Sequence, residues 1–113
     1  MTPPPPLRLL VAAGPDAPGV SQLLVEARAA AVGGGRVSVF FTDAGLDVLG
    51  ASTPGSEGIG GLERAGARLS LCARSARSRG LEPARLPSTV LWSSLTSFLR
   101  DLEPEARLWS AFP

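Results

Sequence analysis

Short apolar runs alternate with helical patterns along most of this chain, and glycine or proline lies at most of the junctions. The runs are residues 7–13, 37–41, 68–71, 89–92 and 106–112. Each has the length and the apolar or β-branched composition of a strand. Strands joined by single helices form right-handed crossovers, which require a parallel sheet with helices on both faces. The sequence therefore predicts an α/β fold, a small three-layer α/β/α domain.

The segments between the runs carry the spacing of short helices. Apolar residues recur every three or four positions from Val20 to Ala31, and Gly33-Gly34-Gly35 ends that pattern. Ser93 or Ser94 is placed to cap a later helix. Three further apolar sets predict one helical turn, a short helix and a C-terminal helix: Leu46 and Leu49; Ile59, Leu62 and Ala65; and Leu95, Phe98, Leu99 and Leu102.

The first six residues differ in composition from the rest. Met1-Thr2 is followed by four prolines, so residues 1–6 are expected to form a disordered proline-rich tail before a single domain over residues 7–113. The tail lacks the charged and apolar regions of a signal peptide. No run approaches the ~18 apolar residues that cross a bilayer. We therefore expect a cytoplasmic protein without a membrane partner.

The residue types present limit the chemistry. The chain has 113 residues, a net charge of +1 and no histidine, which removes the usual general base and the commonest metal ligand. Hydrolase triads and metal sites are not expected, and nothing points to a cofactor. A charge of +1 also gives little attraction for nucleic acid. A single cysteine excludes an internal disulfide or a C-x-x-C redox pair.

That single cysteine, Cys72, lies where the strand-like run meets an arginine-rich stretch ending at Gly80. A thiol at a helix N-terminus near Arg74, Arg77 and Arg79 would have a lowered pKa and react as a thiolate. A lone cysteine after a strand can equally be a small buried hydrophobe. Both readings stay open on this pattern alone.

Asp43 follows the second run as Cys72 follows the third, so both are expected at the carboxyl-end rim of the sheet. Ligands and catalytic groups of parallel sheets gather at that rim. A cysteine-dependent phosphatase loop would need arginine six positions after the cysteine, where Ser78 stands. The glycines of residues 58–61 lack the lysine of a phosphate-binding loop.

Three segments resemble the DsrE/DsrF-like family, which includes the TusD-type sulfur-relay subunits. Residues 62–81 are similar to its "AG-v-v-x-v-C" strand followed by a helix ending in "R-G-l/i". Residues 37–45 resemble its second strand and "F-x-x-D-G-v" loop, with Ala44-Gly45 in place of the usual direct Asp-Gly. Residues 92–102 resemble its "a-s-l-x-d-l" helix.

The resemblance implies a flavodoxin-like parallel five-stranded sheet and homo- or hetero-oligomers. It also implies that Cys72 carries sulfane sulfur as a persulfide between donor and acceptor proteins, which would make the chain a sulfurtransferase. The alternative is a non-catalytic subunit of the same fold with an inert Cys72. In that case the C-terminal strand, with Trp109 and Phe112, would pack against another chain.

Overall fold

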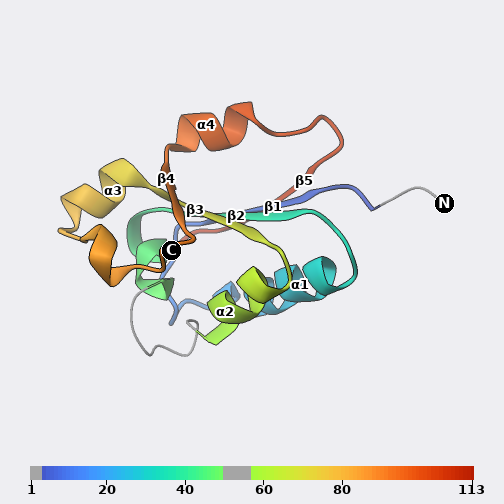
Figure 1. The fold of residues 1–113 in the computed structure, drawn as a ribbon, viewed down its shortest axis with the longest axis horizontal. Helices are drawn as coiled ribbons and strands as arrows, with labels where there is room; N and C mark the ends of the chain where they lie inside the picture. Colours follow the sequence, from blue (N-terminus) through green and yellow to red (C-terminus); the bar gives the residue numbers. More distant parts are fainter. Residues whose placement is uncertain (1–3, 50–56) are drawn as a thin grey trace.

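The computed structural model describes residues 4–49 and 57–113. The five strands are β1 (Leu7–Val11), β2 (Val37–Phe41), β3 (Arg68–Cys72), β4 (Leu91–Ser93) and β5 (Arg107–Ala111). The helices are α1 (Val20–Val32), α2 (Glu57–Arg64), α3 (Ala73–Ser78) and α4 (Leu95–Arg100), with 3₁₀ turns at Asp43–Val48 and Pro83–Arg85. Every expected strand is present, within two residues of its expected bounds (Figure 1).

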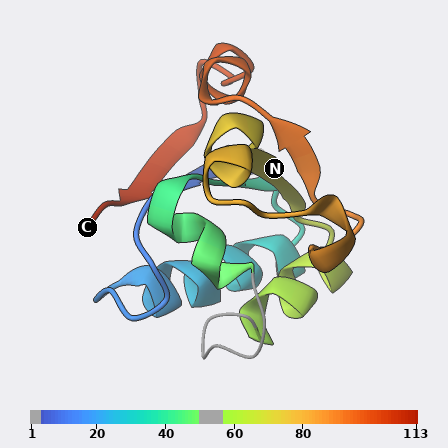
Figure 2. The ribbon, with the colours of Figure 1, turned by 90° about the vertical axis from the view of Figure 1, so that its left-hand side faces the viewer.

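The sheet confirms the predicted α/β class, because all five strands are parallel. Their order is β4-β3-β2-β1-β5, whereas flavodoxin itself has the order 2-1-3-4-5. The chain moves in one direction from β1 to β4 and then returns past β1 to β5. Since crossovers are right-handed, this reversal places α4 on the opposite face from α1 and α2 (Figure 2). We call these sides the α1 face and the α4 face.

The main core lies on the α1 face. Alternate strand residues such as Leu9, Val39 and Leu69 point into it, because side chains of a strand alternate between faces. From α1 the buried residues are Val20, Leu24, Ala27 and Ala31, the stripe expected from the sequence except for Leu23, which is partly buried. Trp92 and Trp109 pack against this core from the outer strands.

The α4 face holds a much smaller core, formed by Leu10, Phe40 and Phe98 with Cys72 beside them. The Phe40 and Phe98 rings stack with centroids 5.2 Å apart. The prediction that α4 buries an apolar face is wrong in part, because Leu95 and Leu99 remain 39% and 42% exposed. Polar residues occupy many of the strand positions on this side of the sheet. Phe98 is therefore the one residue of α4 that packs in this small core.

The N-terminal segment joins the sheet one residue before the predicted boundary. Pro6 is buried, and its carbonyl accepts a hydrogen bond of 2.8 Å from the Arg107 amide. The other expectations for the tail, disorder above all, stay predictions. No helix within residues 4–49 and 57–113 has the length and apolar character that a bilayer crossing requires.

Gly45 fixes the loop after β2 against the end of β1. A Cβ atom at Gly45 would lie 2.0 Å from the Val11 carbonyl oxygen, which also accepts a hydrogen bond of 3.0 Å from the Thr42 amide. Only glycine allows this approach. The loop carries Thr42 and Asp43, so the contact determines where those side chains lie.

We expect Gly45→Ala to lower the free energy of unfolding by about 1–3 kcal/mol, because the new methyl group must displace backbone. Gly14→Ala is the matched control, since its Cβ would meet its nearest atom, the Ala44 carbonyl oxygen, at an ordinary 3.7 Å. Urea unfolding of both variants measures the difference. Equal stability of the two variants would contradict the close approach.

Candidate functional site

Cys72 ends β3 and is also the N-cap residue of α3. Its backbone is extended, and its sulfur accepts a hydrogen bond of 3.5 Å from the Ser75 amide, the position that a capping side chain contacts. After α3, Gly80 adopts a positive φ of 69°, as expected for the glycine that ends a helix. The Cys72 residue is partly exposed. The thiol is therefore positioned by a hydrogen bond from the first turn of α3, and it is not fully buried in the core.

Ser75 links Cys72 to the loop after β2. The Ser75 hydroxyl donates to Asp43 Oδ1 at 3.2 Å and lies 3.1 Å from the Thr42 hydroxyl. Asp43 is exposed and has a φ of 49°, a conformation that aspartate tolerates better than most residues. The structure thus brings Cys72 and Asp43 to one rim through Ser75.

The environment lowers the pKa of the Cys72 thiol below its ordinary value. Partial burial acts in the opposite direction and raises the pKa, because it disfavours the charged thiolate. Hydrogen bonds favour the thiolate, and together their effect on the pKa outweighs that of burial. They come from the Ser75 side chain and amide, the Thr42 hydroxyl and the Arg74 amide. The thiolate consequently persists to lower pH than in an unfolded chain.

The three arginines lie in different surroundings. Arg79 forms an exposed ion pair with Asp47, with Nη2 at 2.8 and 2.9 Å from the two carboxylate oxygens. Arg74 and Arg77 are exposed on α3, and Arg74 acts on the thiol through its backbone amide. Stabilisation of the thiolate by the guanidinium groups stays a prediction.

Sequence reasoning did not find Thr42 and Ser75. Ser75 stands three residues after Cys72, the spacing of a capping interaction, and this is the signal that indicates it. Thr42 directly follows a buried strand and so reaches the same rim. Within the described residues, no three His, Cys, Asp or Glu side chains gather as metal ligands would.

Two solved structures are similar in fold. The ychN protein from E. coli has a TM-score of 0.78 and 15% identity, over 95% of this chain and 99% of its own. MTH1491 from Methanobacterium thermoautotrophicum, titled a protein of unknown function, has a TM-score of 0.75 and 19% identity, over 94% of this chain and 99% of its own. No family model matches the sequence, and no curated protein matches it.

Both structures have the DsrE/DsrF-like fold, and at these identities the likeness shows the fold alone. The likeness covers nearly the whole chain, and the described residues form the parallel five-stranded sheet that the resemblance implied. Neither likeness carries an activity over to this chain, whose chemistry depends on the residues around Cys72.

We expect the rate of Cys72 alkylation by iodoacetamide to rise with pH through a midpoint below that of the urea-unfolded chain. The folded thiolate is stabilised, so its population is retained as pH falls and is lost only through the lowered pKa. Ser75→Ala removes the hydroxyl and should move the midpoint upward. The pH dependence of the pseudo-first-order rate measures both.

Ser78→Ala is the matched control, because Ser78 is exposed at the other end of α3. Its midpoint should equal that of the wild type. Identical midpoints for all three proteins would show that Ser75 does not tune the thiol.

Proposed function

We propose that this protein is a DsrE/DsrF-like sulfur carrier that holds sulfane sulfur as a persulfide on Cys72. One observation carries the proposal: the single thiol is partly exposed at the rim of a parallel sheet, and its surroundings lower its pKa. A carrier needs these two properties, access for a partner and a thiol whose pKa lies below its ordinary value. The fold shared with the ychN protein and MTH1491 supports the proposal.

The transfer consists of two exchange steps. In the first, the Cys72 thiolate attacks the outer sulfur of a donor persulfide, forming a new S–S bond while the donor's S–S bond breaks and the donor leaves as a thiolate. In the second, an acceptor thiolate attacks the outer sulfur of Cys72-S-SH and releases the Cys72 thiolate. Neither step changes the net oxidation state or needs a histidine, so the chain's composition is sufficient.

The donor and acceptor in this proposal are other protein chains in the cytoplasm, and the protein works as a homo- or hetero-oligomer. Asp43 holds Ser75 in place and so acts on the thiol through it. Thr42 contacts the Ser75 hydroxyl, and its own hydroxyl also favours the thiolate directly. Arg74 and Arg77 lie exposed on the helix that Cys72 caps. They would attract the anionic persulfide of a donor.

A second function, an interaction subunit with an inert Cys72, is favoured by the exposed apolar residues. On the α4 face Leu91, Leu95, Leu99 and Leu108 are 39–56% exposed, and Phe112 beyond β5 is 64% exposed. Such residues are typical of contact surfaces between chains when they are grouped. The two functions differ in whether Cys72 takes up sulfur.

Sulfur uptake tests the proposal. Incubated with a cysteine desulfurase and cysteine, the wild-type protein should gain about 32 Da, one sulfur atom, and lose it to a thiol reductant. Cys72→Ser should stay folded and gain nothing, because the chain has no second thiol. Intact-mass spectrometry measures the gain.

Ser75→Ala keeps the thiol and should take up the same mass more slowly near neutral pH. This variant separates loss of the nucleophile from loss of its activation. A folded wild type that gains no mass from any persulfide donor would leave the interaction subunit as the function.

A further inference from the structure

A row of polar side chains crosses the α4 face at the start of the central strands. Arg8 of β1 is the register partner of Ser38 of β2, which in turn is the partner of Arg68 of β3. Neighbouring strands lie about 4.8 Å apart, so Arg8 and Arg68 flank Ser38 at close range. Arg36, two residues before Ser38, lines the same cavity. Three arginines therefore line one cavity at the amino-terminal rim of the sheet.

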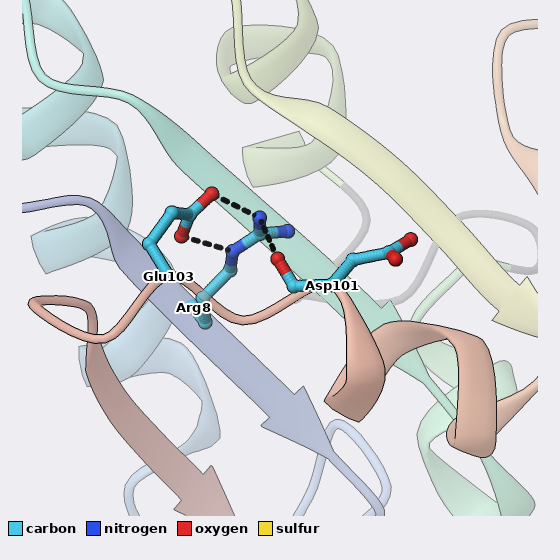
Figure 3. A network of polar contacts seen from close by, with 3 residues as sticks. All are labelled: Arg8, Asp101 and Glu103. Atoms are coloured by element: carbon cyan, nitrogen blue, oxygen red, sulfur yellow. Dashed lines mark hydrogen bonds and ion pairs between the residues drawn. The ribbon is translucent and has the colours of Figure 1, made fainter.

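Arg8 is held in a fixed position within this group. Its Nε donates to Glu103 Oε2 at 3.2 Å, and its Nη2 donates to Glu103 Oε1 at 2.5 Å and to the Asp101 carbonyl at 3.1 Å. Figure 3 shows these three bonds, with the Asp101 carboxylate directed away from Arg8. The Arg8 guanidinium also lies 5.9 Å from the centre of the Phe98 ring. The Arg8 guanidinium group therefore lines the cavity in an orientation that these contacts fix.

Within the described part of the chain, Arg36 and Arg68 have no such partner. Among residues 4–49 and 57–113, no carboxylate lies within ion-pair distance of either, while Glu103 is engaged by Arg8. The hydrogen bond from Arg8 lowers the pKa of Glu103, and the charges of Arg8 and Arg36 lower it further. With Glu103 ionised, the three guanidinium groups around the cavity retain two uncompensated positive charges.

The cavity has room for a small ligand. It measures about 190 Å³ and is lined by the three arginines together with Glu103, Ser38, Pro6, Val37 and Gly66. This is below the roughly 300–1,000 Å³ of pockets for larger organic ligands. A guanidinium group matches the oxygens of a phosphate with two parallel N–H donors, and a phosphate monoester, whose second pKa is about 6, is largely a dianion at about pH 7.

We propose that Arg8, Arg36, Arg68 and Ser38 form a binding site for the phosphate group of a small molecule. The dianion neutralises the two free guanidinium charges, and the Ser38 hydroxyl donates to a third oxygen. Cys72 lies at the other end of β3, about 13 Å along the strand at 3.3 Å per residue. The site is therefore separate from the thiol and does not depend on the sulfur-carrier function.

Thermal unfolding with inorganic phosphate against chloride at equal ionic strength tests the site. The wild-type melting temperature should rise with phosphate and saturate, because a ligand of the native state stabilises it. Arg36→Gln should weaken the apparent Kd at least about tenfold, as expected for losing a charged hydrogen bond. Arg36→Gln/Arg68→Gln should abolish the saturable part of the shift.

Arg64→Gln/Arg85→Gln is the control, since both residues are exposed and neither lines the cavity. It should keep the wild-type shift. Phosphate also stabilises proteins by exclusion from their surface, and that effect would be equal in all variants. Equal shifts, or no shift in any variant, would overturn the proposal.

Glycerol 3-phosphate distinguishes the source of the phosphate group. Tighter binding of the ester than of the free ion, lost in Arg36→Gln, assigns the site to a phosphorylated small molecule. Tighter binding of the free ion, lost in the same variant, assigns it to inorganic phosphate. Calorimetric titration of the wild type and of Arg36→Gln with each ligand completes the test. If neither ligand gives a binding heat in the wild type that Arg36→Gln removes, the proposed site is overturned.

Discussion

The alternation of side chains along β1, β2 and β3 determines where each functional group of this protein lies. One set of positions supplies the large apolar core under α1 and α2. The other set faces α4 and begins with Arg8, Ser38 and Arg68 and ends, on β3, with Cys72. A register shift of one residue would bury the arginines and expose the core, so register is strongly specified. Both candidate sites follow from this one constraint.

Two opposing effects act on the pKa of the Cys72 thiol. Contact with the small core of Phe40 and Phe98 disfavours the thiolate, while the start of α3 and the neighbouring hydroxyls favour it. The hydrogen bonds win because they act directly on the sulfur and burial is only partial. Gly45 makes this balance possible, since the loop can bring Thr42 and Asp43 to Ser75 only if it passes close to the Val11 carbonyl.

The sequence predicted the number of strands, their parallel direction and the rim shared by Asp43 and Cys72. These depend on local patterns of apolar residues and on the rules of parallel sheets. The strand order could not be predicted from local sequence patterns, because helical spacing does not reveal that the chain reverses direction across the sheet after β4. The burial of α4 was overestimated, since the polar residues opposite it come from β1, β2 and β3.

The parts of the sites that escaped prediction depend on contacts between distant segments. Ser75 meets Asp43 across 32 positions, and Arg8 meets Glu103 across 95. Each of these residues is an ordinary polar side chain in the sequence. Only the register of β1, β2 and β3 gathers the arginines, and only the Gly45 turn brings the hydroxyls to the sulfur.

The hydrogen bonds at the start of α3 should make the folded Cys72 thiol more reactive than an ordinary thiol. The most direct measurement is the rate of labelling of Cys72 by a small alkylating reagent at pH 7, native against urea-unfolded, with the rate of free cysteine measured under both conditions as a reference. We expect the native thiol to react faster than the unfolded one, because its lowered pKa raises the thiolate fraction and it is partly exposed. A native thiol that is protected and labels only after unfolding would show that folding does not activate Cys72.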